Sequence, residues 1–188
     1  PAVPAPPMNV PEATGPLTDL ESIAPDAALT GAAIASAPGG PRRLAFFGPK
    51  GGVGATAIAA NVAGVLAKLG SRSVIVDMDL QLGAVPVSLG VVPQKSIAEL
   101  VVAAEGGPGS IRGETLDHHS SGVAIVAQPE IDNLDAITAQ RVPRFFDCLA
   151  DEFDYVVIDG LRDFSDLAMV CLDASDLIVV VFTQDVPA

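Results

Sequence analysis

The fold is decided by the stretch Gly48-Pro49-Lys50-Gly51-Gly52-Val53-Gly54-Ala55-Thr56. It follows the apolar run 44–47 and leads into a segment of helical composition, residues 55–69. Strand, glycine-rich turn and helix form the context in which backbone N–H groups cradle a phosphate at a helix N-terminus. The phosphate-loop pattern GxxxxGK[ST] places a lysine directly before the hydroxyl residue. This chain has Ala55 at that position, so the stretch predicts a phosphate loop without its usual lysine.

The composition favours a parallel α/β sheet and argues against binding to nucleic acid. The chain has 188 residues, of which 49% are hydrophobic, and contains seven Phe and no Trp. Its core must therefore consist mainly of Val, Leu, Ile and Ala, as in parallel sheets covered by helices. Ten Lys and Arg stand against 23 Asp and Glu, a net charge of −13. Because so few cations cannot form a broad basic face, we expect no nucleic-acid partner for this fragment, and a local basic patch on a missing segment stays open.

Membrane spans and disulfides are also not expected. No apolar run in the sequence approaches the ~18 residues that a membrane-spanning helix needs. Cys148 and Cys171 lie in different expected helices and form no Cys-x-x-Cys motif. We therefore expect two free thiols in a cytoplasmic protein.

The chain consists of two regions that differ in composition and in hydrophobic pattern. Residues 1–41 are rich in Pro and Ala, which predicts a flexible linker, whereas residues 42–188 alternate strand-like and helix-like segments. We expect strands at 44–47, 73–77, 123–126, 155–159 and 177–182, and helices at 56–69, 96–104, 111–116, 141–153 and 165–172. A loop is expected between 80 and 90. The alternation predicts a three-layer α/β domain with a mostly parallel sheet and helices on both faces. Because the chain stops just after a strand, we expect this domain to be truncated at its C-terminus.

Acidic residues follow two of the expected strands, at the edge where open α/β sheets bind ligands. Asp77 and Asp79 follow the second strand, and Asp159 ends the fourth. A carboxylate such as Asp159 and the hydroxyl of Thr56 are suited to hold Mg²⁺ beside a phosphate. Asp79 is then placed to orient an attacking water molecule.

Other interpretations of these residues remain open. Asp77 fits either a ligand role or a buried structural acid that accepts hydrogen bonds from loop amides. The alternative for the glycine loop is a tight turn without a ligand, and the alternative for Asp159 is a solvated strand-end acid or a helix-capping acid.

At these residues the chain resembles the deviant Walker A class, the MinD/ParA-type ATPases. Lys50 matches the signature lysine of that class, which reaches across a dimer to the partner's nucleotide. Asp79 is similar to the second acid of the class's DxD segment, and Asp159 to its Walker B aspartate. The resemblance implies ATP or ADP with Mg²⁺ held by Thr56 and Asp159, and catalytic roles for Asp79 and for Lys50 in trans. The nucleotide-binding residues that it implies are Lys50, Gly51, Gly52, Val53, Gly54, Ala55 and Thr56.

A narrower resemblance covers nearly all of residues 44–188. The segments 79–83, 89–93, 172–176 and 185–188 are similar to the TadZ/CpaE branch, which comprises localisation proteins of tight-adherence (Tad) pilus machines. That branch commonly reads GVGA[ST], so Ala55 fits it. Pro49 departs from the MinD pattern, which usually has glycine there.

This resemblance implies a homodimeric, nucleotide-responsive positioning or assembly factor with weak or no ATP hydrolysis. Its partners would be pilus or secretion-machine proteins, and it would lie in the cytoplasm, at the inner membrane or the cell pole. Loss of the lysine removes a charge-assisted contact worth about 1.5–3 kcal/mol, so binding can survive when fast hydrolysis does not. Two alternatives stay open: an active MinD/ParA-like ATPase that cycles on membrane or DNA, and a scaffold whose pocket never holds nucleotide.

Overall fold

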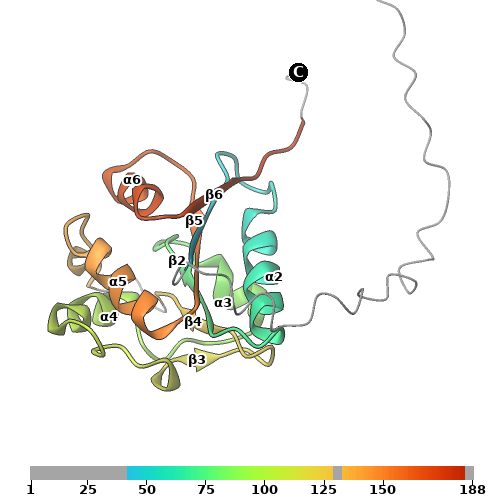
Figure 1. Ribbon diagram of the computed structural model, residues 1–188. Helices are drawn as coiled ribbons and strands as arrows, with labels where there is room; N and C mark the ends of the chain where they lie inside the picture. The colour runs from blue at the N-terminus through green and yellow to red at the C-terminus, as the bar shows by residue number, and fades with distance from the viewer. Residues whose placement is uncertain (1–41, 129–132, 185–188) are drawn as a thin grey trace, which may run out of the picture.

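The computed structural model describes residues 42–128 and 133–184 (Figure 1). Within these residues a sheet of six strands has the order β3-β4-β2-β5-β1-β6. Neighbouring strands are parallel except β3, which runs antiparallel to β4. The linker expected over residues 1–41 lies outside the described residues. The strands are β1 (Arg42–Phe47), β2 (Ser73–Asp77), β3 (Asp117–His118), β4 (Ala124–Val126), β5 (Tyr155–Leu161) and β6 (Leu177–Val180).

Helices cover both faces of the sheet, which confirms the expected three-layer α/β architecture (Figure 1). Successive side chains of a strand point to opposite faces. Val74 and Val76 pack in the cluster formed with α4 (Ile97–Ala103), α5 (Val142–Glu152) and α6 (Asp166–Asp173). Ile75, between them, packs in the cluster formed with α2 (Ala55–Lys68) and α3 (Ala84–Leu89). The central strands are thus apolar on both faces, as a doubly covered sheet requires.

Two helix starts follow directly from the sequence. Ser96 and Glu99 form the expected capping box before α4: the Glu99 N–H donates to Ser96 Oγ and the Ser96 N–H donates to Glu99 Oε2, both at 3.1 Å. Pro143 lies in the first turn of α5, where no helical hydrogen bond is lost. The expected start of this helix near Arg141 is therefore confirmed.

Four local expectations were wrong. Residues 80–90 do not form a loop throughout, because Gly83 and Gly90 adopt left-handed conformations that bound the short helix α3. The helix expected at 111–116 is only a 3₁₀ turn over Gly113–Thr115, and it leads into β3, which was not expected. β5 continues to Leu161, two residues further than expected, and β6 ends at Val180 instead of at residue 182.

The two thiols lie in the helical layer beside α5 and α6. Cys148 and Cys171 are both free, as expected, and the structure shows that both are buried. Burial raises the pKa of the Cys171 thiol to about 12. The Cys171 thiol is therefore not suited to be a nucleophile at neutral pH.

The edge strand β6 is much less covered than the strands inside the sheet. It pairs with β1, and within the described residues no strand pairs with its other edge. Leu177 is 53% exposed and Val180 55% exposed, whereas Val156 and Val157 of β5 are fully buried. Within residues 42–128 and 133–184 no helix has the length and apolar character to cross a bilayer.

Candidate functional site

The glycine loop joins β1 to α2 at the carboxyl edge of the sheet. Gly52 and Gly54 have φ angles of 81° and 89°, a left-handed conformation that glycine adopts without steric cost. Gly54 is the residue directly before α2, so the helix begins at Ala55 and its first N–H groups face the loop. The Gly48 N–H donates to the Leu161 carbonyl at 2.9 Å, which fastens the start of the loop to the end of β5.

A pocket of about 270 Å³ opens at this loop. All seven predicted nucleotide-binding residues, Lys50 to Thr56, line it. Asp159 lines it as well, so the structure brings the two predicted magnesium ligands, Thr56 and Asp159, to one cavity. The remaining lining residues are Gly48, Ala84, Gly160, Leu161 and Arg162.

Asp159 is the most unusual side chain in this pocket. It is fully buried on β5, and neither carboxylate oxygen has a hydrogen-bond partner of good geometry. Burial raises its pKa above the usual range, an effect that the nearby Thr56 hydroxyl, the Gly160 N–H and the charge of Arg162 partly offset. A buried carboxylate without well-formed hydrogen bonds costs free energy unless a cation or proton compensates it.

These properties fit a divalent cation at Asp159. Carboxylate and hydroxyl oxygens are the ligands that Mg²⁺ prefers, and it usually keeps water and phosphate oxygens as well. No group of three or more His, Cys, Asp or Glu in the described part of the chain forms a metal site by itself. Mg²⁺ bound by Thr56 and Asp159 would therefore depend on oxygens from a phosphate ligand and from water.

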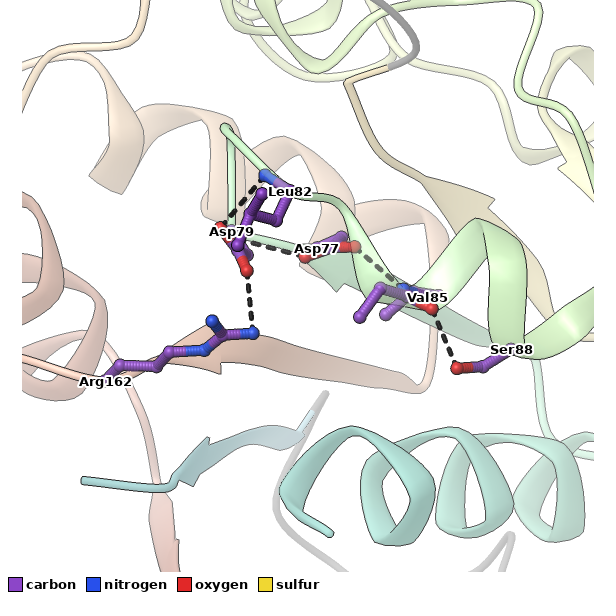
Figure 2. Close-up of polar contacts among 7 residues, drawn as sticks. Asp77, Asp79, Leu82, Val85, Ser88 and Arg162 are labelled. Carbon is purple, nitrogen blue, oxygen red and sulfur yellow. Dashed lines mark hydrogen bonds and ion pairs between the residues drawn. The ribbon is translucent and has the colours of Figure 1, made fainter. Parts of the chain in front are cut away.

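Asp77 has the role of a structural acid. Its Oδ1 accepts a hydrogen bond from the Asp79 N–H at 3.0 Å, and its Oδ2 accepts one from the Val85 N–H at 2.9 Å (Figure 2). The side chain is only 1% exposed, and burial raises its pKa to about 6. Of the two roles left open for Asp77, these contacts support the one in which it binds loop amides and holds α3 against β2.

Asp79 is ion-paired with a residue that the sequence interpretation missed. Asp79 Oδ2 lies 2.7 Å from Arg162 Nη2 (Figure 2). Asp79 Oδ1 accepts a weak hydrogen bond from the Leu82 N–H at 3.3 Å. Asp79 is not among the residues that line the glycine-loop pocket, whereas Arg162 is. Arg162 lies three residues after Asp159, directly after the two residues by which β5 is longer than expected, and no local pattern in the sequence marked it.

Gly160 explains how Asp79 and Arg162 come together. It has a φ of 86°, and a Cβ atom built on it would lie 2.3 Å from the Asp79 backbone nitrogen. Only glycine therefore allows the end of β5 to pass so close to the segment that follows β2. The side chains of Asp79 and Arg162 point toward one another (Figure 2).

The chain has relatives of known sequence. A family model described as AAA domain matches residues 42–187. The chromosome-partitioning ATPase Soj of Thermus thermophilus is 33% identical over 144 residues, which cover 74% of this chain and 53% of Soj. The antiactivator FleN of Pseudomonas aeruginosa is 29% identical over 152 residues, which cover 76% of this chain and 50% of FleN. The chain thus spans about half the length of these curated relatives.

Solved structures show the same fold. A ParA family ATPase from Chlorobium tepidum has a TM-score of 0.66 at 22% identity, covering 74% of this chain and 59% of that one. Cobyrinic acid a,c-diamide synthase from Mycobacterium smegmatis, solved with a bound ATP analog and magnesium, has a TM-score of 0.61 at 26% identity. That match covers 76% of this chain and 60% of the synthase.

Proposed function

Since the chain belongs to the AAA-domain family and, with its relatives, to the MinD/ParA ATPase superfamily, we propose that it is a nucleotide-responsive positioning factor. It binds ATP·Mg²⁺ in the glycine-loop pocket, dimerises around the nucleotide and hydrolyses it slowly or not at all. Its narrower role, which rests on the TadZ/CpaE resemblance, is to place or assemble a Tad-type pilus or a related polar secretion machine. It does so at the cytoplasmic side of the membrane or at the cell pole.

The observation that carries this proposal is the buried carboxylate of Asp159 in the wall of the pocket. A scaffold that never held a ligand would keep this uncompensated group at a cost in stability. Mg²⁺ bridging Asp159, Thr56 and the phosphates would compensate the charge. A relative in structure that holds an ATP analog and magnesium supports this assignment.

Slow hydrolysis is proposed because of Ala55 and Asp79. The backbone N–H groups of the loop remain whatever side chain stands at 55, so the loop still offers phosphate binding. Without a lysine there, the charge that develops on the transferred phosphoryl group loses a stabilising contact. Asp79, the residue expected to orient water, is ion-paired with Arg162.

Dimerisation is proposed to depend on Lys50. This lysine is exposed and lines the pocket, so it is accessible to a second copy of the chain. If each Lys50 contacts the nucleotide of the other subunit, nucleotide favours the dimer by mass action.

The test is a calorimetric titration of the chain with ATP·Mg²⁺, with the oligomer mass measured in parallel. We expect binding, a nucleotide-dependent dimer and turnover far below one per second. Lys50→Ala should remove the dimer while leaving the monomer able to bind nucleotide. Lys68→Ala is the matched control, because Lys68 lies at the other end of α2 and should leave dimerisation unchanged. Absence of binding at millimolar ATP·Mg²⁺ would overturn the proposal.

An active ATPase is the second candidate, favoured by the 33% identity to Soj, a chromosome-partitioning ATPase. The second candidate differs from the first in its rate of ATP hydrolysis. Steady turnover near one per second, abolished by Asp79→Ala, would replace the proposed slow nucleotide switch with an ATPase cycle.

A further inference from the structure

We propose that Arg162 supplies the phosphate-binding cation that Ala55 cannot, and that it reaches the phosphate by exchanging its ion pair with Asp79. This inference rests on the proposed binding of ATP·Mg²⁺ in the glycine-loop pocket. It gives Arg162 a role as a nucleotide-binding residue and gives Asp79 a second function, which is to hold Arg162 until the nucleotide arrives.

The position of Arg162 between two cavities is the first observation. On one side it lines the glycine-loop pocket together with Lys50, Thr56 and Asp159. On the other side it lines a second pocket of about 270 Å³, which Asp79 and Ser165 also line. Of these two pockets Asp79 lines only the second, so Arg162 is shared between the pocket that holds Asp79 and the pocket where phosphates would bind.

The charges of the glycine-loop pocket are the second observation. Among its lining residues the side chains of Lys50 and Arg162 are cationic, and the side chain of Asp159 is anionic. Ala55 adds no charge where the phosphate-loop pattern has lysine. With Lys50 proposed to act on the nucleotide of the other subunit, Arg162 is the lining cation left for the nucleotide of its own subunit.

The chemistry of the guanidinium favours the exchange. Arginine offers a planar fork of N–H donors that binds two phosphate oxygens at once, and it remains charged at every physiological pH. Its contact with Asp79 is a single pair of atoms at 2.7 Å, and the Arg162 side chain is 43% exposed, so a substantial part of it lies in solvent. The triphosphate carries several negative charges and Asp79 only one, so the phosphates attract the guanidinium more strongly.

Asp79 remains anchored after the exchange. Its Oδ1 keeps the hydrogen bond from the Leu82 N–H, and its own N–H still donates to Asp77 Oδ1 (Figure 2). Departure of Arg162 leaves Asp79 Oδ2 without a cation and free to accept a hydrogen bond from water. Binding of the nucleotide therefore also releases the Asp79 carboxylate from its ion pair.

The competing explanation is a structural one, in which the ion pair only ties the end of β5 to the segment after β2. A structural ion pair affects the stability of the protein but does not distinguish among nucleotides by their phosphates. The two explanations therefore predict different affinities for ATP, ADP and AMP.

The experiment measures the affinities of the whole chain for ATP·Mg²⁺, ADP·Mg²⁺ and AMP by calorimetric titration. Loss of one charge-assisted contact corresponds to roughly a ten- to hundredfold weakening. We expect Arg162→Gln to weaken ATP binding by that factor and to leave the affinity for AMP within about twofold. Arg162→Lys should recover part of the loss for ATP. Arg112→Gln is the matched control, because Arg112 is exposed, pairs only loosely with Glu114 at 3.8 Å and does not line the pocket.

Asp79→Asn tests the exchange itself. It removes the competitor for Arg162, so ATP should bind more tightly than in the unmodified chain. The same substitution in the Arg162→Gln background should leave ATP affinity unchanged, since no guanidinium remains to be released. A structural ion pair would give no tightening in either background.

The outcomes separate this inference from the proposed function. Binding of ATP by the unmodified chain with equal affinity in Arg162→Gln would overturn the role of Arg162 and leave the proposed function standing. Absence of ATP binding by the unmodified chain would overturn both. Selective loss of ATP affinity in Arg162→Gln, together with tightening in Asp79→Asn, would establish the exchange.

Discussion

Gly160 lies so close to Asp79 that a Cβ atom on Gly160 would be 2.3 Å from the Asp79 nitrogen and 3.0 Å from the Asp79 Cβ. The crossing brings the end of β5 against the segment that follows β2. Asp159 precedes this glycine and Arg162 follows it, so one residue without a side chain sets the spacing among the charged groups of the site.

Gly160→Ala is expected to destabilise the protein more than an alanine at an unobstructed glycine of similar conformation. Left-handed backbone costs an alanine about 1–2 kcal/mol, and the overlap with Asp79 should add about 1–3 kcal/mol. Gly109→Ala is the matched control, because Gly109 has a φ of 77° and a Cβ atom added to it would meet nothing within 4 Å. Chemical denaturation of both variants measures the difference, and equal losses would contradict the close approach.

Asp159→Asn is expected to stabilise the protein while removing the effect of Mg²⁺ on nucleotide binding. At pH 7 the substitution removes a buried charge that lacks well-formed hydrogen bonds, and the free energy of unfolding should rise by about 1–3 kcal/mol. ATP affinity measured with Mg²⁺ and with a chelator should become equal. Asp163→Asn provides the control, since Asp163 is exposed and bonded to Ser165. A variant that lost stability or kept its Mg²⁺ dependence would count against Asp159 as a ligand.

The stability of the protein should depend on the protonation of Asp77. Its pKa is about 6 in the folded protein, raised first by burial, against an ordinary value of 3.8. Between these values the folded state binds more protons than the unfolded state, so the free energy of unfolding falls as pH rises from about 4 to about 6. The contribution that is lost amounts to about 3 kcal/mol.

The measurement for Asp77 compares the unmodified chain with Asp77→Asn, which cannot titrate at this position. Urea denaturation at several pH values gives the difference in unfolding free energy, and other carboxylates largely cancel in it. We expect the advantage of the unmodified chain over the variant to be greatest near pH 4 and smallest at pH 7. A difference that grew with pH would show that Asp77 is ionised throughout.

Ala55→Lys is expected to tighten ATP·Mg²⁺ binding by roughly ten- to hundredfold, because it restores one charge-assisted contact to the phosphates. Ala57→Lys adds the same charge to the exposed face of α2, outside the pocket, and should change affinity little. Calorimetric titration distinguishes the two. Equal ATP affinity in the unmodified chain, Ala55→Lys and Ala57→Lys would contradict this prediction. It would mean that the loop, which contains Pro49, does not hold the phosphates at the start of α2.

The sequence predicted the elements whose signals are local. The glycine loop, the capping box of Ser96 and Glu99, and the start of α5 at Pro143 depend on neighbouring residues only. Apolar strands followed by acids predicted that Asp159 would lie beside the loop, because the ends of parallel strands share an edge.

Features that depend on contacts between distant segments were not predicted. The helix α3 is held by the bond from the Val85 N–H to Asp77, eight residues earlier, and periodicity over six residues is too short to indicate a helix. Two structural features position Arg162 beside Asp79. β5 extends past Asp159, and Gly160 lets the backbone there pass close to Asp79. An arginine in an apparently polar loop carried no such information.

The exposed strand β6 has a practical consequence for every measurement of oligomer mass. Its edge, unpaired within the described residues, carries backbone N–H and C=O groups flanked by exposed Leu177, Ile178 and Val180, which is a template for strand pairing between molecules. Such pairing would produce dimers that form without nucleotide and persist in the Lys50→Ala variant. The substitution Ile178→Lys would suppress these dimers. Any dimer that the variant still forms on addition of ATP·Mg²⁺ then depends on nucleotide bound in the glycine-loop pocket.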